Sequence, residues 1–314
     1  MTQMLEIEGL TKRFGSLTAV DGISFSVDRG EVLGFLGPNG AGKTTAMRMV
    51  TGFLPPTAGR VLVEGFDVAT DPIAVKKRIG YLPEGAPLYE DMTPLELLGF
   101  IADVRGISGA AKGRAIDQAA ERINIRHVLR QSIGTLSKGF KRRVGIAQAI
   151  LHDPDVLILD EPTDGLDPNQ KHEVRRLINE MAPNKVIVIS THLLEEVEMV
   201  CSRAIVIARG RIVADGTPLE LEARSRHHNA VVVCLPGDQA DACRGRISAI
   251  EGVASVEVVS DGDGATRLIA FSQSGGVIVD RVSAQLRGSD FRIDELRVER
   301  GRLDDVFREL TTAA

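Results

Sequence analysis

The sequence predicts an α/β protein with a helical insertion in its first domain and a smaller α+β second domain. Three short, continuous apolar runs, at residues 31–36, 156–160 and 186–190, are typical of parallel strands covered on both faces. Helix-like segments separate these runs, and the last part of the chain reads strand, helix, strand, strand, helix, strand. A length of 314 residues allows two compact domains. We therefore expect a first domain built on a parallel sheet and a second, separate domain.

The first thirty residues alternate between apolar and polar side chains. Leu5 and Ile7 alternate with Glu6 and Glu8, and residues 23–27 repeat the pattern. A period of two predicts strands that are buried on one face only.

A helix is predicted directly after Lys43. Ala46, Met49 and Val50 recur at helical spacing, and Gly52 supplies a stop signal. The stretch therefore reads strand, glycine-rich loop, helix.

Residues 85 to about 152 predict a helical subdomain with little strand. Thr93 followed by Glu96 predicts a capping box at the start of one helix. A second helix is expected over residues 110–123, and a third is expected to begin near Ser137.

Polar residues 223–229 are expected to be a linker between a first domain of residues 1–222 and a second domain of residues 230–314. The order βαββαβ in the second domain predicts a small ferredoxin-like fold. Its expected elements are strand 230–235, helix 238–250, strand 254–260, strand 266–272, helix 277–287, strand 291–298 and helix 303–311.

Composition and charge favour a protein of the cytoplasm. Apolar residues make up 43% and charged residues 26% of the chain, as in globular proteins, and the net charge of −5 gives no general attraction to nucleic acid. No apolar run approaches the roughly 18 to 20 residues that cross a bilayer, and charges occupy the N-terminal stretch where a signal peptide would be apolar. Cys201, Cys234 and Cys243 match no metal-ligand spacing, so free reduced thiols are expected.

Residues 37–45 match the pattern G-x-x-x-x-G-K-[ST], with Gly37, Gly42, Lys43 and Thr44 in register. Glycines allow successive backbone N–H groups to surround phosphate oxygens, and the following helix adds its positive N-terminal end. Lysine would neutralise phosphate charge, and the threonine hydroxyl would bind Mg²⁺. A glycine-rich turn without function is the alternative. The preceding strand and the following helix favour the phosphate-binding loop.

Asp160 and Glu161 follow four apolar residues at the carboxyl end of a predicted buried strand. Ligands bind at such strand ends in open α/β sheets. Asp160 would hold Mg²⁺, and Glu161 would orient or deprotonate the attacking water. A single carboxylate here is commonly a helix cap, but two of them in a chain with a phosphate loop favour catalysis.

Four further segments extend this P-loop NTPase pattern to a resemblance with the ATP-binding-cassette (ABC) ATPases. Residues 136–143 (LSKGFKRR) resemble the family's signature sequence, 163–168 (TDGLDP) its D-loop, and 190–198 (STHLLEEVE) its switch-histidine segment. Residues 80–85 (GYLPEG) stand where the family has its Q-loop. Order and spacing match from residue 5 to about residue 218.

The resemblance implies that two copies face each other head to tail and that each ATP, with Mg²⁺, lies between them. Ser137 and the amide of Gly139 would then meet the γ-phosphate bound by the other copy. His192 would contact the γ-phosphate and help to arrange water, and Asp167 would lie at the interface. Phe14 would stack on adenine, although a lone phenylalanine beside a strand is as often part of the core.

The expected site residues fall into three groups. Catalytic roles are expected for Glu161, His192, Lys43 and Glu84, and metal contacts for Thr44, Glu84 and Asp160. Nucleotide contacts are expected for Phe14, Gly37, Pro38, Asn39, Gly40, Ala41, Gly42, Lys43, Thr44, Thr45, Ser137, Gly139 and Asp167.

This chain departs from the family pattern at three positions. Glu84 stands in place of the usual glutamine and brings a formal charge near Mg²⁺ and water. Lys138 and Phe140 replace the glycine and glutamine of the signature, whereas Ser137 and Gly139 are retained.

An ATPase of this kind acts through a partner. Residues 80–101 (GYLPEGAPLYEDMTPLELLGFI) and 303–310 (LDDVFREL) resemble the ABC-2 type exporter branch, which includes drug-efflux and gliding-motility ATPases. That resemblance implies a separate membrane-spanning permease subunit and a location on the cytoplasmic face of the membrane. The alternative is a soluble ABC protein acting on ribosomes or DNA. The basic triplet at residues 141–143 could suggest nucleic acid, but three basic residues on an exposed helix turn are usually solvated, and no nucleic-acid partner is expected.

Overall fold

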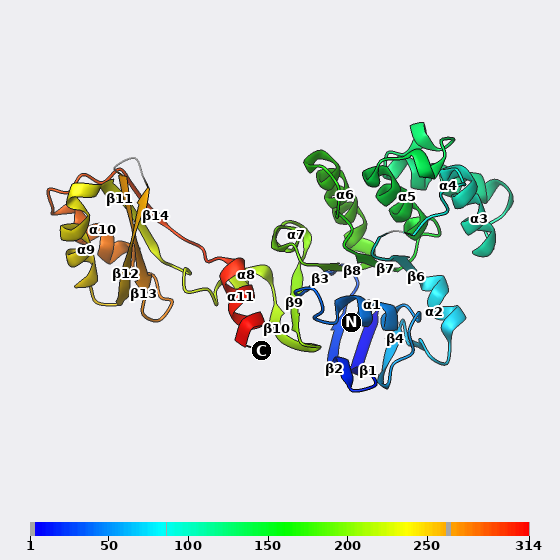
Figure 1. Ribbon diagram of the computed structural model, residues 1–314, viewed down its shortest axis with the longest axis horizontal. Coiled ribbons are helices and arrows are strands. Elements are labelled where there is room, and N and C mark those ends of the chain that lie inside the picture. The colour runs from blue at the N-terminus through cyan, green and yellow to red at the C-terminus, as the bar shows by residue number, and fades with distance from the viewer. Residues whose placement is uncertain (1–3, 86, 262–264, 314) are drawn as a thin grey trace. The chain divides into compact units, whose positions relative to one another are not determined.

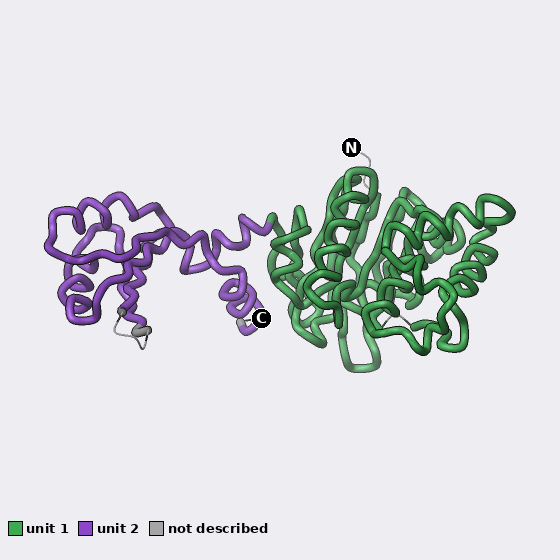
Figure 2. Tube along the Cα trace, turned by 90° about the horizontal axis from the view of Figure 1, so that it is seen from above, with its two compact units in different colours: residues 1–217, 313–314 green, residues 218–312 purple. Residues whose placement is uncertain are grey.

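The computed structural model describes residues 4–85, 87–261 and 265–313 (Figure 1). Residues 1–217, with 313–314, form one compact unit, and residues 218–312 form another (Figure 2). The short helix α8 (Pro218–Glu222) thus belongs to the second unit, whereas the sequence placed residues up to 222 in the first domain.

A four-stranded antiparallel sheet contains the chain's first strands. Leu5 and Ile7 are buried, so the alternation in the sequence is confirmed as a strand with one buried face. Its strand order is β2-β1-β4-β5, with β1 (Leu5–Phe14), β2 (Leu17–Val27), β4 (Ala58–Val63) and β5 (Phe66–Asp67).

A six-stranded sheet contains the three apolar runs as β3 (Val32–Leu36), β7 (Val156–Asp160) and β8 (Val186–Thr191), in which every residue is buried. Its order is β10-β9-β3-β8-β7-β6, and all pairs are parallel except β10 with β9. The remaining strands are β6 (Ile79–Leu82), β9 (Arg203–Ala208) and β10 (Arg211–Gly216). Because β3, β8, β7 and β6 are adjacent and parallel, the segments that follow them meet at one edge of the sheet.

Helix α1 (Lys43–Val50) packs between the two sheets. Ala46, Met47, Met49 and Val50 are buried in one core with side chains of both sheets, among them Leu5, Val61, Ile158 and Val188. This packing fixes the start of α1 at the sheet edge where β3 ends.

The helical subdomain lies beside β6 and contains α3 (Pro94–Val104), α4 (Gly109–Arg122) and α5 (Lys138–Ile150) (Figure 1). The start of α5 near Ser137 is confirmed, and Ser137 is its N-cap. Among the described residues, no helix combines the length and apolar character that crossing a membrane requires. The other helices of this unit are α2 (Pro72–Arg78), α6 (Pro168–Met181) and α7 (Leu194–Val200), with short 3₁₀ turns at Arg126–Val128, Ile133–Thr135 and Ala182–Asn184.

The capping box at α3 predicts a measurable contribution to stability. Thr93 Oγ1 accepts from the Glu96 amide at 3.2 Å, and Glu96 Oε2 accepts from the Thr93 amide at 2.8 Å. Thr93→Ala should lower the opening free energy of α3 amides by about 1 kcal/mol, measured by hydrogen exchange. Ser108→Ala is the matched control, because Ser108 is an N-cap without a side-chain cap bond and its loss should cost under about 0.5 kcal/mol. Equal losses would contradict the capping role.

The second unit has the predicted ferredoxin-like order of elements. Its antiparallel sheet runs β12-β13-β11-β14, with α9 and α10 packed on the face that carries Val231, Val233 and Leu235. Its elements are β11 (Val231–Pro236), the 3₁₀ turn Gly237–Gln239, α9 (Ala240–Ser248), β12 (Val253–Asp261), β13 (Ala265–Ser272), α10 (Val279–Arg287), β14 (Glu295–Val298) and α11 (Leu303–Ala313).

The last strand is shorter than the predicted 291–298. The Arg292 amide donates to the side chain of Gln239 at 2.9 Å and not to a strand, and the first backbone bond to β11 comes from the Asp294 amide to the Cys234 carbonyl at 2.9 Å. Phe291 and Ile293 instead pack against the core beneath the helices.

The segment expected as a linker is packed within the second unit. Ser225 and His227 are 5% and 4% exposed, and His227 Nδ1 lies 2.6 Å from Asp305 Oδ2 on α11. Helix α11 buries Leu303 and Val306. Residues before β11 and after β14 therefore stabilise each other.

Candidate functional site

The loop between β3 and α1 requires glycine at its last position. Gly42 has φ +107°, and a Cβ atom there would lie 2.4 Å from the Ala19 carbonyl oxygen. Any other residue would be strained and would collide with the backbone of β2. The turn places the first amides of α1 around an open space, which suits an anion.

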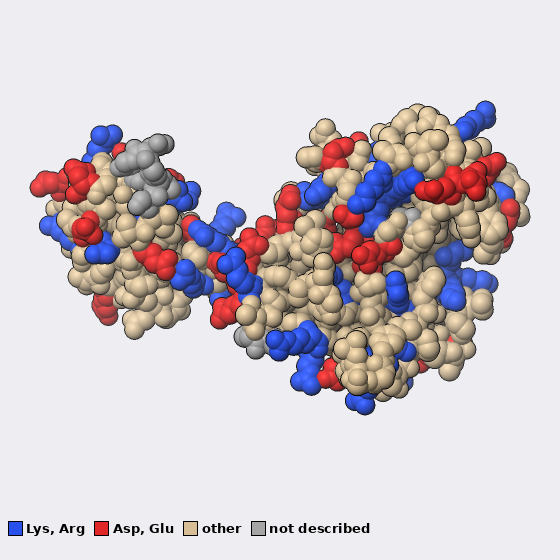
Figure 3. Space-filling view, in the orientation of Figure 1, with Lys and Arg blue, Asp and Glu red and all other residues tan. Residues whose placement is uncertain are grey.

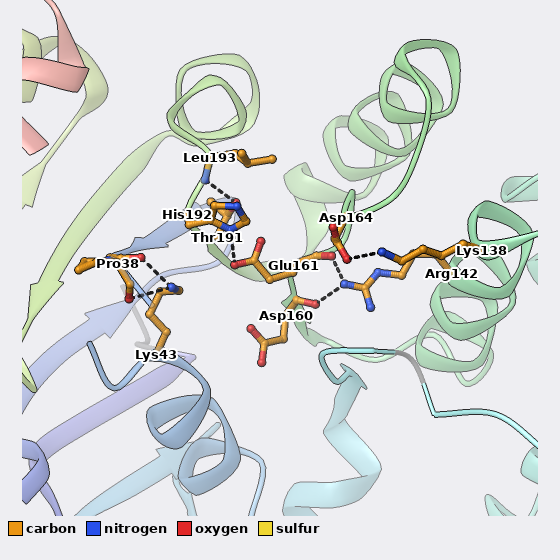
Figure 4. A network of polar contacts seen from close by, with 11 residues as sticks. Pro38, Lys43, Lys138, Arg142, Asp160, Glu161, Asp164, Thr191, His192 and Leu193 are labelled. Carbon is orange, nitrogen blue, oxygen red and sulfur yellow. Dashed lines mark hydrogen bonds and ion pairs between the residues drawn. The ribbon is translucent and has the colours of Figure 1, made fainter. Parts of the chain in front are cut away.

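Lys43 is held in this loop by backbone carbonyls. Its side chain is only 7% exposed, and Nζ donates to the oxygens of Gly37 at 2.6 Å and Pro38 at 3.3 Å (Figure 4). Burial lowers the pKa of Lys43, and the charges of Glu161, Asp160 and Glu84 oppose that shift. The lysine is thus a desolvated cation beside three carboxylates.

A cavity of about 380 Å³ opens over the loop. Ten of the expected site residues line it, and two lining residues, Leu17 and Ala19, were not expected. Leu17 pairs with Phe14 across the β1–β2 hairpin, and both are exposed. An apolar residue close to Phe14 at the hairpin end was the signal that could have identified Leu17 as a lining residue. The ten are Phe14, Pro38, Asn39, Gly40, Gly42, Lys43, Thr44, Thr45, Glu84 and Glu161.

Four other expected residues are not among those that line the cavity. Gly37 contributes its carbonyl to Lys43, and Ala41 is buried in the core. Asp160 is buried at the end of β7, and His192 follows β8.

Asp160 carries a carboxylate with no hydrogen-bond partner among the described residues. The residue is fully buried, and both Oδ1 and Oδ2 lack such a bond. Burial raises the pKa of Asp160, against the opposing influence of the nearby Ser190 and Thr44 hydroxyls. An unpartnered buried carboxylate near a threonine hydroxyl suits a divalent cation held by few protein ligands, as Mg²⁺ is. No group of three acidic, histidine or cysteine side chains that could hold a metal alone occurs in the described ranges.

The raised pKa predicts that Asp160→Asn stabilises the protein without metal or nucleotide. Since the folded state binds this proton more tightly than the unfolded state, stability falls as pH rises from 3.8 through the raised pKa. At pH 7 in EDTA the asparagine variant should therefore melt at a higher temperature, and the difference should shrink in acid.

Asp155→Asn, at the other end of β7, is the control. Asp155 pairs with Arg29 at 3.0 Å and should give no such gain. A lower melting temperature for Asp160→Asn would contradict the prediction.

Glu161 adopts a left-handed backbone conformation and faces His192. Its φ is +52°, and its amide donates to the Ser190 carbonyl at 2.8 Å. His192 Nδ1 lies 2.9 Å from Glu161 Oε1, and because a carboxylate can only accept, Nδ1 carries the hydrogen (Figure 4). This contact fixes the imidazole and the carboxylate relative to each other.

Glu84 is exposed, follows β6 and lines the cavity. Its charge contributes to the raised pKa of Asp160 and opposes the lowered pKa of Lys43. The site therefore contains a third carboxylate, which a glutamine would not supply.

Ser137, Gly139 and Asp167 lie away from this cavity. Ser137 accepts from the Phe140 amide at 3.3 Å as the cap of α5, and Asp167 accepts from the Gln170 amide at 2.9 Å as the cap of α6. A Cβ on Gly139 would lie 2.3 Å from Gln170 Oε1. Their contact with the nucleotide of a second copy stays a prediction.

The sequence interpretation of residues 141–143 is wrong for two of the three. Arg142 and Arg143 are 4% and 5% exposed, because both lie on faces of α5 that pack inside the unit. Arg142 Nη2 donates to the carbonyls of Asp160, at 2.8 Å, and of Glu161 (Figure 4). Nothing in the sequence distinguished this site residue from a solvated arginine.

Comparison with known proteins places these features in one family. Residues 20–164 match the family described as ABC transporter. The chain is 38% identical over 223 residues to the probable multidrug ABC transporter ATP-binding protein YbhF of Escherichia coli (strain K12), covering 71% of this chain but only 38% of that longer protein. It is 32% identical over 310 residues to the linearmycin resistance ATP-binding protein LnrL of Bacillus subtilis (strain 168), covering 98% of each. A solved structure of an ATP-binding subunit of an ABC transporter superposes with a TM-score of 0.65 at 31% identity, covering 70% of this chain and 92% of that one.

Proposed function

The chain belongs to the ABC transporter family, and from that membership we propose that it is the ATP-binding and ATP-hydrolysing subunit of an exporter. The observation that carries the proposal is the convergence of Lys43, Glu84, Asp160, Glu161 and His192 at the ends of adjacent parallel strands. Such a set can neutralise a triphosphate and orient a water for its hydrolysis.

Each residue has a distinct part in this chemistry. The amides of the loop and Lys43 bind the phosphates, and Phe14 and Leu17 offer an apolar surface to the base. Mg²⁺, when bound, would neutralise charge on the phosphate oxygens, held by Thr44 and Asp160 with Glu84 near. Glu161 accepts a hydrogen bond or a proton from the attacking water. The hydrogen bond with His192 fixes the direction of the Glu161 carboxylate.

A second copy completes the site in this proposal. Ser137 and Gly139 of one copy would contact the γ-phosphate bound by the other, with Asp167 at the interface. The N-terminus of α5 suits this role because amides in the first turn of a helix have no acceptor within the helix and can donate to an anion. Loss of the γ-phosphate would then release the two copies and convert hydrolysis into movement.

A separate membrane-spanning subunit of the ABC-2 type is the proposed partner, which would hold the chain at the cytoplasmic face of the membrane. Relatives named for multidrug transport and for linearmycin resistance support export. On the face drawn in Figure 3, basic and acidic side chains are interspersed, which does not favour a nucleic-acid partner.

Capture from membranes tests the proposal. The tagged chain, purified from detergent-solubilised membranes of its own cells, should bring down a polypeptide with several apolar spans, and the complex should hydrolyse Mg²⁺-ATP. Association with ribosomes in the absence of a membrane polypeptide would overturn the exporter assignment. Failure of the complex to bind or cleave ATP would overturn the enzymatic one.

A further inference from the structure

Arg142 connects the helical subdomain to the catalytic edge of the sheet. Its guanidinium is buried and donates through Nη2 to the carbonyls of Asp160, at 2.8 Å, and Glu161. Nη1 donates to the Pro83 carbonyl at 3.4 Å, next to Glu84. One side chain of α5 therefore holds the backbone at the ends of β7 and β6.

The backbone that Arg142 contacts includes Glu161, whose conformation is unfavourable. A left-handed conformation costs a residue other than glycine about 1–2 kcal/mol, so Glu161 stays there only where its surroundings impose it. Its carbonyl accepts from the Asp164 amide at 3.2 Å and from Arg142. Rotation of this residue would turn the carboxylate away from His192 and from the cavity.

Helix α5 also carries the segment proposed to meet the second copy's nucleotide. Its first turn contacts the segments after Glu161. Lys138 Nζ lies 2.9 Å from Asp164 Oδ2 (Figure 4). Gly139 packs against Gln170 on α6. A displacement of α5 would therefore move both Arg142 and the turn that follows Glu161.

We propose that Arg142 is a positioning residue, which fixes the backbone of Asp160 and Glu161 and makes the direction of the Glu161 carboxylate depend on the position of α5. This inference rests on the proposed ATPase function. Through Arg142, contact of α5 with one nucleotide prepares the catalytic carboxylate that acts on the other. An arginine is required because its planar guanidinium donates to several carbonyls at once, which a lysine ammonium at the end of a flexible stem does not match.

Arg143 provides a matched control on the same helix. It is equally buried, but its contacts are with Glu173 at 2.7 Å, the Phe140 ring at 5.5 Å and the Ile123 carbonyl at 3.4 Å. Arg142→Met and Arg143→Met therefore each remove a buried cation from α5, and the first alone removes the bonds to Asp160 and Glu161.

The test compares turnover with nucleotide affinity in the full-length protein with its membrane partner. Arg142→Met should lower kcat by about tenfold to a hundredfold, as for a misplaced catalytic group, and leave the Kd for a fluorescent ATP analogue within about twofold. Arg143→Met should change kcat by less than about threefold. Equal losses of kcat in the two variants, or a parallel loss of affinity with Arg142→Met, would overturn the inference.

If Arg142→Met does not fold, a second variant, Arg142→Lys, tests the inference. Arg142→Lys keeps the charge and most of the volume, and should fold with unchanged affinity but lower kcat by at least about fivefold. Turnover equal to that of the unaltered protein would overturn the positioning role while leaving the ATPase assignment intact. If the unaltered complex itself neither binds nor cleaves ATP, the proposed function fails first and this inference fails with it.

Discussion

Glu161→Gln should reduce ATP turnover by about a hundredfold or more and leave ATP binding intact. The amide keeps the size of the side chain, and its oxygen can still accept from His192 Nδ1, now at 2.9 Å from Oε1. It cannot accept a proton from water or supply the negative charge that orients it. Without cleavage, the γ-phosphate would stay between the two copies, so the variant should remain an ATP-bound dimer. Phosphate release and light scattering with Mg²⁺-ATP measure the two effects.

Glu180→Gln is the control for this experiment. Glu180 lies on α6, and its carboxylate is 60% exposed in an ion pair with Arg176. Such a surface pair contributes little, so both turnover and dimer formation should be unchanged. Undiminished hydrolysis by Glu161→Gln would show that Glu161 does not have its assigned catalytic role. The positioning role proposed for Arg142 would then also fail.

Much of the fold could be predicted because its strongest signals are local in sequence. Continuous apolar runs identified β3, β7 and β8, and the loop pattern before Lys43 located the start of α1. Parallel pairing of neighbouring strands then brings their carboxyl ends together, so the sequence was enough to place Asp160 and Lys43 at one site.

Contacts between distant segments could not be predicted in the same way. Arg142 and Arg143 are adjacent in sequence and identical in residue type, but only Arg142 reaches the carbonyls at the end of β7. Which face of α5 points to the sheet depends on how the helix is docked, because a rotation of about 100° separates neighbouring helical residues. The left-handed conformation of Glu161 likewise follows from its packing and not from its residue type.

At the start of the second unit, too, a contact between distant segments could not be predicted from the sequence. Polar residues 223–229 have the composition of a linker, but Ser225 and His227 are buried where the chain returns as α11. The partner, Asp305, is nearly eighty residues later in sequence, so no local pattern reveals it.

Lys43→Ala should weaken binding of a non-hydrolysable ATP analogue by about tenfold to a hundredfold, which corresponds to loss of one charge-assisted bond of about 1.5–3 kcal/mol. The ammonium group is the only cation lining the cavity among the described residues, so its removal leaves phosphate charge opposite Glu84 and Glu161 without compensation. The fold should tolerate the change. Burial lowers the pKa of Lys43, which means that the unfolded chain binds this proton more tightly than the folded protein does. Below the lowered pKa the lysine is charged, and burying that charge opposes folding, so its removal should not destabilise the protein.

Calorimetry with Mg²⁺ measures the affinity, and Lys77→Ala is the control. Lys77 is exposed on α2 and does not line the cavity, so its loss should leave the affinity unchanged. Normal affinity in Lys43→Ala, with an unchanged melting temperature, would contradict the assignment of Lys43 to phosphate binding, because the remaining backbone amides would then suffice. A loss of affinity with the melting temperature preserved would instead assign the effect to the phosphate contact, since the buried carbonyls of Gly37 and Pro38 lose only a donor that water can replace.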